Sequence, residues 1–255
     1  MILKESQLLT LKGVSKNFGG LRAVNDLSME VSKGYIYGLI GPNGAGKTTV
    51  FNLITGVYPC NSGDILLEDV AVTALKSYRI ARLGISRTFQ TIRLFPSMTT
   101  WENVLIGQNY LSKSGIRGIL PVQRSQEVEL RRQAEEALKV LGLWEMRDRK
   151  AVTLPYGSQR KVEIARAVAA QPKLLLLDEP TAGMNIRETK DILGVLSKIH
   201  GLGITILVIE HDMRVVMGIC DHIFVLNFGQ KIAEGTPAEI RKNEEVLEAY
   251  LGKEE

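Results

Sequence analysis

The chain has 255 residues, of which 45% are hydrophobic and 24% are charged. This balance is typical of a globular protein with one large α/β domain and a real hydrophobic core. The net charge of +4 permits contact with nucleic acid or an anionic membrane surface but predicts neither. The two cysteines, Cys60 and Cys220, lack the spacing of a metal or redox site, which indicates reduced thiols in a cytosolic compartment. The three histidines are scattered, so a histidine-based metal site is not expected.

The sequence predicts neither a secretory signal nor a membrane span. Polar residues at positions 4–7 interrupt the N-terminus before an apolar signal region can form. No stretch approaches the roughly 18 apolar residues of a membrane-crossing helix. We therefore expect that the chain does not span a membrane by itself and that any membrane role comes through a partner.

Strands are expected first along the chain. Leu9 and Leu11 alternate with polar neighbours, and residues 27–31 repeat that pattern, which is typical of half-buried strands. A turn at residues 58–63 precedes a short strand over residues 64–67. From about Ser77 the pattern becomes mainly helical.

Between these early strands lies a complete phosphate-binding loop. Residues 41–48 read Gly-Pro-Asn-Gly-Ala-Gly-Lys-Thr, which matches G-x-x-x-x-G-K-[ST] over its full length. An apolar run precedes the loop and a helix-compatible run, residues 49–54, follows it. This strand–loop–helix setting is the context that the motif requires.

The loop predicts binding of a nucleoside polyphosphate. Its backbone N–H groups and the positive end of the following helix would hold the phosphates. Gly44 and Gly46 keep side chains out of the way of the phosphates. Lys47 would neutralise the β- and γ-phosphates, and Thr48 would ligate Mg²⁺.

The second half of the chain predicts a long helix followed by buried strands. Over residues 125–141, the side chains of Ala134, Ala137, Leu138 and Leu141 fall on one face of a helix. Two acid-first i,i+4 pairs, Glu127–Arg131 and Glu135–Lys139, support that helix. The apolar runs at residues 173–177 and 204–209 indicate strands buried on both faces, as in a parallel sheet. Between them we expect a helix with Ile192, Leu196 and Ile199 on one face.

Two acidic residues follow the first of these buried runs. Asp178 stands at the carboxyl end of the strand, where it would hold Mg²⁺ through water. Glu179 follows at once and would polarise an attacking water as general base or electrostatic anchor. No Asn-Lys-x-Asp segment for reading guanine occurs in the chain, which argues against a GTPase.

The order of these motifs resembles that of the ABC ATPases, the nucleotide-binding subunits of ATP-binding-cassette transporters, over nearly the whole chain. The resemblance implies an α/β fold in which a P-loop NTPase (RecA-like) core carries an antiparallel β-subdomain and an inserted α-helical subdomain. We expect one ABC ATPase domain over residues 1–255. Its nucleotide-binding core would comprise residues 1–88 and 166–236, its helical subdomain residues 89–165, and its C-terminal helical tail residues 237–255.

Residues 154–166, Leu-Pro-Tyr-Gly-Ser-Gln-Arg-Lys-Val-Glu-Ile-Ala-Arg, resemble the signature segment of that family. In the family this segment opens a helix that points at the γ-phosphate held by the opposite subunit. Pro155 stands where the family has a serine, and Tyr156 stands where it has a glycine. Pro155 suits the first turn of a helix, so we expect a functional but altered signature, with Val162, Ala165 and Ala169 on its buried face.

Further positions match the family by order. Phe18 resembles the aromatic residue that stacks on adenine, Gln90 the glutamine that senses Mg²⁺ and the γ-phosphate, and His211 the switch histidine. Asn185 lies where the family has an aspartate in a segment that crosses the dimer. Motifs and resemblance together predict nucleotide contacts from Phe18, Gly41, Pro42, Asn43, Gly44, Ala45, Gly46, Lys47, Thr48, Thr49, Tyr156, Gly157 and Ser158, Mg²⁺ contacts from Thr48, Gln90 and Asp178, and catalytic roles for Glu179, His211 and Gln90.

The variable segments favour one branch of the family. Residues 84–104, residues 233–240 and the closing Tyr-Leu-Gly at 250–252 resemble the ATPase subunits of branched-chain (hydrophobic) amino-acid importers. The resemblance implies that two chains sandwich two ATP–Mg²⁺, that two transmembrane permeases dock near Ile92, Leu94 and Phe95, and that a substrate-binding protein takes part indirectly. We expect a sister ATPase as the second cassette, with a homodimer as the alternative, at the cytoplasmic face of the plasma (inner) membrane. Nucleic acid is not an expected partner.

Three alternatives stay open at this point. The same ATPase role could serve another cargo, as in urea importers or lipopolysaccharide export. A soluble cassette protein of translation or DNA repair is disfavoured, because those proteins usually carry two cassettes or a long coiled coil. A nucleotide-sensing subunit with degenerate hydrolysis is suggested by Pro155 and opposed by Glu179 and His211.

Overall fold

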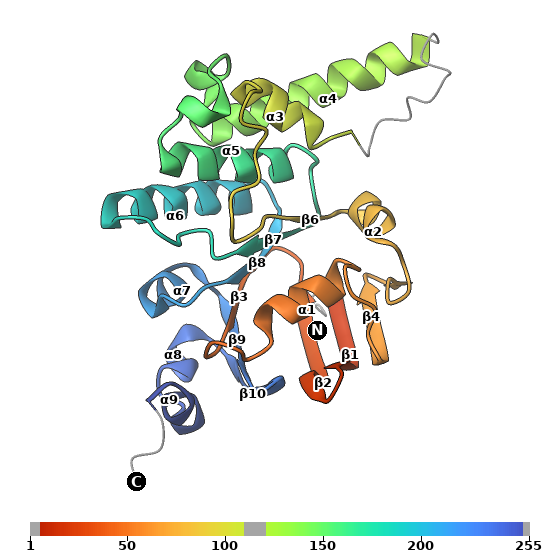
Figure 1. Cartoon of the computed structure of the whole chain (residues 1–255), viewed down its shortest axis with the longest axis vertical. Helices are drawn as coiled ribbons and strands as arrows, with labels where there is room; N and C mark the ends of the chain where they lie inside the picture. Colours follow the sequence, from red (N-terminus) through yellow and green to blue (C-terminus); the bar gives the residue numbers. More distant parts are fainter. Residues whose placement is uncertain (1–5, 110–120, 252–255) are drawn as a thin grey trace, which may run out of the picture.

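The computed structural model describes residues 6–109 and 121–251, and a six-stranded sheet forms its centre (Figure 1). The strand order is β10-β9-β3-β8-β7-β6, and β10 alone runs antiparallel to its neighbour. The strands are β3 (Ile36–Ile40), β6 (Ile85–Arg87), β7 (Leu174–Asp178), β8 (Thr205–Ile209), β9 (His222–Asn227) and β10 (Gln230–Gly235). The parallel pairing brings the carboxyl ends of β3, β7 and β8 to one edge of the sheet, where the predicted site residues follow.

Strands β7 and β8 are buried on both faces, which confirms the expectation from their apolar runs. Leu175 and Leu177 of β7 belong to a hydrophobic cluster on one face, whereas Leu174 and Leu176 belong to a second cluster on the other. Strand β8 divides its side chains in the same way. Such strands need cover on both sides, and the remaining elements supply it.

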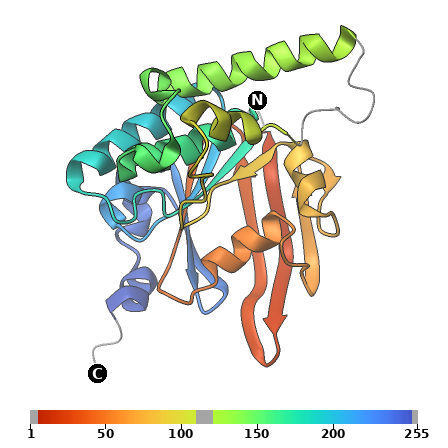
Figure 2. The same cartoon turned by 45° about the horizontal axis from the view of Figure 1, so that its top comes forward.

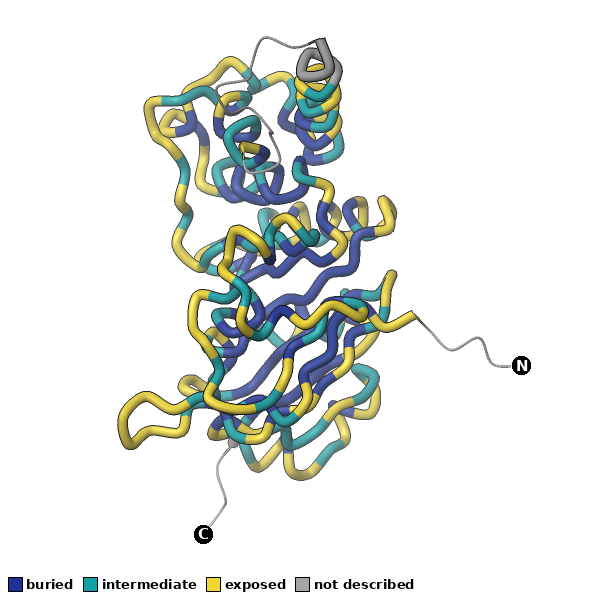
Figure 3. The backbone as a smooth tube through the Cα atoms, turned by 90° about the vertical axis from the view of Figure 1, so that its right-hand side faces the viewer, coloured by how far each residue is buried: buried dark blue, intermediate teal, exposed yellow. Residues whose placement is uncertain are grey.

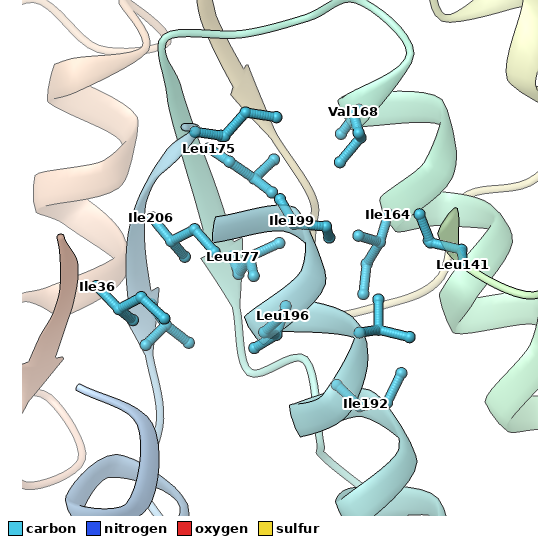
Figure 4. Packing of buried hydrophobic residues seen from close by; sticks show 14 of the residues in the cluster. Ile36, Leu141, Ile164, Val168, Leu175, Leu177, Ile192, Leu196, Ile199 and Ile206 are labelled. Atoms are coloured by element: carbon cyan, nitrogen blue, oxygen red, sulfur yellow. The ribbon is translucent and has the colours of Figure 1, made fainter. Parts of the chain in front are cut away.

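Helices cover the first face. Ile192, Leu196 and Ile199 of α6 (Ile186–Gly201) pack between the sheet and α5 (Tyr156–Val168), as predicted (Figure 4). Behind α5 lie α3 (Thr100–Ile106) and α4 (Pro121–Val140), which form the top of the molecule in Figure 1. The residues in and just after α4 that we predicted to share one face are buried: Ala134, Ala137, Leu138 and Leu141. Both predicted ion pairs of this helix, Glu127–Arg131 and Glu135–Lys139, form.

An antiparallel sheet covers the other face. Its order is β2-β1-β4-β5, formed by β1 (Gln7–Phe18), β2 (Leu21–Ser32), β4 (Ser62–Leu67) and β5 (Val70–Ala71). Helix α1 (Lys47–Ile54) contributes Val50 and Phe51 to the cluster between the two sheets, and α2 (Ser77–Leu83) contributes Ile80. Figure 3 shows the buried backbone concentrated along the strands, with exposed backbone in the turns and outer helix faces.

Three short helices accompany β9 and β10: α7 (Met213–Ile219) precedes β9, and α8 (Pro237–Ile240) and α9 (Glu244–Leu251) follow β10. Figure 2 shows them on the side of the core away from the β1–β2 hairpin. The boundary that we expected at residue 165 falls inside α5, which continues to Val168. The polar interruption at residues 4–5 and the tail beyond residue 251 lie outside the described residues.

No helix within residues 6–109 and 121–251 combines the length and the apolar character that a membrane-crossing segment needs.

Candidate nucleotide site

The phosphate loop leaves the end of β3 and turns into α1, and two of its glycines are required by close packing. Gly41 has φ +148°, and a Cβ there would lie 2.0 Å from the carbonyl oxygen of Leu226 on β9. Gly46 has φ +102°, and a Cβ there would lie 2.5 Å from the carbonyl oxygen of Ala23 on β2. The loop is therefore held tightly between the two sheets, and larger residues would push it out of position.

Helix α1 begins with its N–H groups free of side-chain caps. Gly46 is the residue that precedes the helix, it offers no side-chain acceptor, and the first turn contains no acidic residue. The positive end of the helix dipole and these N–H groups therefore remain available to an anion.

The Lys47 side chain is largely buried and folds back onto its own loop. Its Nζ donates hydrogen bonds to the carbonyl oxygens of Gly41 at 2.7 Å and Pro42 at 2.9 Å. Burial lowers the pKa of this amine, while the nearby carboxylates of Glu179 and Asp178 act in the opposite direction. Gly41 and Pro42 thus contribute to the site through Lys47 and are not among the residues that line the hollow described next.

A cavity of about 460 Å³ lies over the loop. It is lined by Phe18, Leu21, Arg22, Ala23, Asn43, Gly44, Ala45, Gly46, Lys47, Thr48, Thr49, Gln90, Glu179 and Phe228. Ten of the predicted residues therefore share one hollow with four others that the sequence did not single out. One of these four, Ala23, lies on β2, and its carbonyl oxygen packs closely against Gly46.

Phe18 ends β1 beside this hollow and is 41% exposed. Its ring meets the ring of Tyr58 edge-on at 5.2 Å between centroids, and Lys16 Nζ lies 5.1 Å from its centroid. One side of the ring is therefore supported by the protein while the residue stays open to a ligand.

Asp178 is buried at the end of β7 and is paired with a cation. Its Oδ2 accepts a hydrogen bond from Arg87 Nη2 at 2.8 Å. Arg87 Nη1 also donates to Asn52 Oδ1 on α1 at 2.7 Å, and the guanidinium lies over the rings of Phe51 and Phe89. Burial raises the pKa of Asp178, and Arg87 counteracts that rise. The acid is thus fixed by β6, β7 and α1 together.

Glu179 brings the two other predicted catalytic side chains together. Its Oε2 accepts a hydrogen bond from Gln90 Nε2 at 2.9 Å and lies 3.7 Å from His211 Nδ1. The backbone of Glu179 is in the left-handed region, with φ +47°, which is uncommon for a residue that has a Cβ. Its N–H donates to the carbonyl oxygen of Ile209 at 2.9 Å, so the ends of β7 and β8 hold it in place.

A buried carboxyl next to His211 fixes the loop that follows Glu179. Glu210 Oε1 accepts hydrogen bonds from the N–H and the hydroxyl of Thr181, at 3.0 and 2.6 Å. Glu210 Oε2 accepts from the N–H of His211 at 3.3 Å. Burial raises the pKa of Glu210, and these hydrogen bonds oppose the rise.

Arg160 connects α5 to the segment that carries Gln90. This fully buried side chain donates to the carbonyl oxygens of Phe89 at 2.8 Å and Gln90 at 2.7 Å, and it pairs with Glu163 Oε2 at 2.8 Å. Burial raises the pKa of Glu163, and Arg160 is the strongest opposing influence. Arg166 continues the connection by donating to the carbonyl oxygen of Arg93 at 2.6 Å.

The signature residues Tyr156, Gly157 and Ser158 open α5 away from the hollow. Tyr156 donates from its hydroxyl to the carbonyl oxygen of Ala182 at 3.2 Å, and a Cβ on Gly157 would lie 3.4 Å from Glu188 Oε1. Val162, Ala165 and Ala169 are buried, as predicted. None of the three signature residues is among those that line the hollow over the phosphate loop.

The expectation that Pro155 occupies the first turn of the signature helix needs revision. Pro155 precedes the first helical turn instead of occupying it: its ψ is 152°, and its carbonyl oxygen accepts the first helical hydrogen bond from Gln159 at 3.0 Å. Leu154 is likewise extended, as is usual before proline, so the helix starts one residue later. Asn185 caps α6, where its side chain accepts hydrogen bonds from the N–H groups of Arg187 and Glu188.

The donors predicted for Mg²⁺ suit that ion chemically. Thr48, Gln90 and Asp178 offer hydroxyl, amide and carboxylate oxygens, the hard ligands that Mg²⁺ takes together with phosphates and water. Thr48 and Gln90 line the hollow, and Asp178 lies directly before Glu179, which also lines it. The part of the chain that the structure describes holds no cluster of three or more His, Cys, Asp or Glu residues that could bind a metal ion by themselves, without ligands from phosphate or water.

Several residues of the site were missed by sequence reasoning. Arg87 lies within the segment that the sequence singled out, three residues before Gln90, yet nothing in its spacing shows that it pairs with Asp178. Arg160 and Glu163 have the spacing of an ordinary helical ion pair, and only the fold shows that the pair is buried. Phe228, in a Gly-containing turn between two strands, gave no signal beyond its apolar character.

The two-sheet architecture, the loop after β3 and the acids after β7 define a P-loop NTPase core of the ATP-binding-cassette type. Comparison with known proteins agrees: residues 24–182 match the family model described as ABC transporter. The chain belongs to the ABC transporter family and is one of its ATP-binding, ATP-hydrolysing subunits. Residues 230–255 match a second model, described as Branched-chain amino acid ATP-binding cassette transporter.

Individual relatives cover nearly the whole chain. The High-affinity branched-chain amino acid transport ATP-binding protein LivG of Escherichia coli (strain K12) is 47% identical over 96% of this chain and 98% of its own length. The Lipopolysaccharide export system ATP-binding protein LptB of the same strain is 34% identical over 96% of this chain and 98% of its own length. Among solved structures, the ADP conformation of MJ1267, an ATP-binding cassette of an ABC transporter, has a TM-score of 0.84 and 34% identity, covering 97% of this chain and 99% of that one.

Proposed function

We propose that this chain is the ATPase subunit of an importer for branched-chain or other hydrophobic amino acids. Support for the cargo comes from the 47% identity to LivG, against 34% for the export protein LptB, and from the match of residues 230–255 to the branched-chain model. The main support for ATP hydrolysis by this chain is that Gln90, Glu179 and His211 come together beside the phosphate loop.

The geometry suggests how each side chain contributes. Lys47 would exchange its two carbonyl partners for phosphate oxygens, while the free N–H groups of α1 hold the remaining charge. Glu179, oriented by Gln90, would hold and polarise the attacking water. His211, at the end of β8, would contact the γ-phosphate. Phe18 would stack on the adenine, with Tyr58 supporting its ring.

Mg²⁺ would be held by Thr48, Gln90 and Asp178, and it would neutralise negative charge on the phosphates. For Asp178 to take part, its carboxylate would have to contact Arg87 and the ion at the same time, or turn away from Arg87.

Two cassettes are proposed to act together. Tyr156, Gly157 and Ser158 open α5 away from the hollow of their own chain, which is the placement expected of residues that serve the ATP of a second cassette. We propose a sister ATPase as that second cassette, two transmembrane permeases and a substrate-binding protein as further partners, and a peripheral position on the cytoplasmic face of the membrane. ATP-driven closure of the two cassettes would assemble the complete site.

A pull-down tests this proposal. The tagged chain is recovered from native membranes with ATP and vanadate, beside a Lys47→Ala control that should not retain nucleotide. Recovery of two polytopic permeases, a second cassette and an amino-acid-binding protein supports the importer. Recovery of lipopolysaccharide-export components, or of ribosomes or DNA-repair factors without permeases, would overturn it.

A further inference from the structure

The turn between β9 and β10 presents an aromatic side chain at a double energetic cost. Phe228 is 85% exposed, the highest value among the large hydrophobic residues of the described chain. Its backbone is in the left-handed region, with φ +44°, where a residue other than glycine, asparagine or aspartate is strained. Folding alone would favour a small polar residue at this turn position. Folding therefore does not account for the exposed aromatic ring, and contact with a ligand would.

The turn cannot move independently of the phosphate loop. Gly229 donates its N–H to the carbonyl oxygen of Ala45 at 3.0 Å, and its own carbonyl oxygen accepts from the N–H of Asn25 at 2.8 Å. A Cβ on Gly229 would lie 2.8 Å from the carbonyl oxygen of Ala23. The neighbour of Phe228 is therefore fixed to the loop on one side and to β2 on the other, so the backbone that carries the ring is held beside the hollow.

Phe228 lines the same hollow as two other exposed apolar side chains. Phe18 is 41% exposed and Leu21 is 67% exposed, and both come from the β1–β2 turn of the antiparallel sheet. Phe228 comes from the parallel sheet, so the apolar lining is supplied from both sheets. Most of the remaining lining is the phosphate loop with Lys47 and Thr48, and the other residues are Arg22, Ala23, Thr49, Gln90 and Glu179. A ligand that fits this lining has a flat apolar part joined to a polyphosphate.

We propose that Phe228 is a second aromatic contact for the nucleoside part of the bound nucleotide, in addition to Phe18. The inference rests on the proposed nucleotide site and adds a residue from a different sheet to it. An aromatic ring that gains one neighbour on binding loses its exposure to water and makes a stacking or edge contact with the base. Phosphates take no part in that contact.

The experiment compares ADP with inorganic tripolyphosphate, which shares the phosphates and lacks the nucleoside. Dissociation constants are measured by calorimetry for the unaltered chain, Phe228→Ala, Phe228→Tyr and Lys47→Ala. We expect Phe228→Ala to weaken ADP by about 5- to 20-fold, the effect of losing one base–aromatic contact. Tripolyphosphate should bind Phe228→Ala as it binds the unaltered chain, and Phe228→Tyr should bind ADP normally.

A matched control is Leu202→Ala, which removes a side chain that is 50% exposed in the turn after α6. It should leave both ligands unaffected. Because Phe228 packs against little, Phe228→Ala should unfold at the same urea concentration as the unaltered chain, which separates ligand contact from folding.

The outcomes distinguish this inference from the function on which it rests. Unchanged ADP affinity in Phe228→Ala, with both ligands lost in Lys47→Ala, would overturn the inference and leave the nucleotide site intact. Equal weakening of ADP and tripolyphosphate would also overturn it, because the turn would then act through the phosphate loop. Failure of the unaltered chain to bind either ligand would contradict the nucleotide site itself.

Discussion

Replacing Arg160 by methionine should remove the strongest polar connection between α5 and the Gln90 segment. The change keeps an unbranched side chain of about the length of the arginine's aliphatic part and deletes three charge-assisted hydrogen bonds, to Phe89, Gln90 and Glu163. It leaves the Glu163 carboxyl, which is 1% exposed, without the strongest group that offsets its burial. Breaking one side of a buried ion pair costs about 3–5 kcal/mol.

That loss is large on the scale of a folded domain. The free energy of unfolding is typically about 5–15 kcal/mol, so Arg160→Met should remove about a fifth of it or more. For a chain of this size each kcal/mol of lost stability lowers the midpoint temperature of thermal unfolding by about 2–4 °C, so we expect that temperature to fall by roughly 6–20 °C. Urea unfolding followed by tryptophan fluorescence is the assay, because Trp101 and Trp144 lie together in the helical region, 6.1 Å apart between ring centroids.

A second substitution tests the reasoning. Adding Glu163→Gln to Arg160→Met removes the stranded charge, so the deficit should fall to about 1–2 kcal/mol, the cost of unsatisfied polar groups alone. The pH dependence should agree. A buried carboxyl whose folded pKa is raised contributes its stability at low pH and loses it as pH rises through that pKa, so the Arg160→Met deficit should be smaller at pH 5.5 than at pH 8. A single-variant loss below about 1 kcal/mol, or a double variant as unstable as the sum of the singles, would refute the argument.

Three further outcomes are expected. Glu179→Gln should bind ATP normally and turn over at least about 100-fold more slowly in the assembled transporter, since the amide cannot accept a proton; a near-normal kcat would remove Glu179 from its role. Gly157→Glu should abolish most hydrolysis while leaving ADP binding to the isolated chain intact, because the residue lies outside the hollow of its own chain; unchanged hydrolysis would contradict the signature assignment. The buried thiol of Cys220, whose pKa burial raises to about 12, should stay unlabelled by iodoacetamide at pH 8 until urea unfolds the chain, and rapid labelling of the native protein would show that this part of the core opens.

The sequence was most informative where a short segment contains its own chemistry. The phosphate loop needs Gly41, Gly46, Lys47 and Thr48 in a fixed spacing, and the structure finds that spacing between a strand and a helix. The buried strands before Asp178 and His211 were equally predictable, because strands covered on both faces are apolar without interruption. Both kinds of signal are local in the chain.

Contacts between distant segments could not be predicted in this way. Arg87 and Asp178 are separated by 91 residues, and Arg160 reaches carbonyl oxygens 70 and 71 residues away. A periodic pattern shows that Arg160 and Glu163 share a helix face, but whether that face meets water or another segment depends on the packing of the whole chain. The role of Pro155 was misplaced for a smaller reason, since a proline can precede a helix as well as begin it.

The left-handed backbone of Glu179 has a consequence for how this position can change over generations. A glycine there would relax the backbone and favour the folded chain, yet it would remove the carboxylate between Gln90 and His211. Selection for durability alone and selection for turnover therefore pull this position in opposite directions. A lineage that kept the nucleotide but no longer needed to cleave it would be expected to lose this glutamate early, while the glycines of the phosphate loop, which the packing itself requires, would persist.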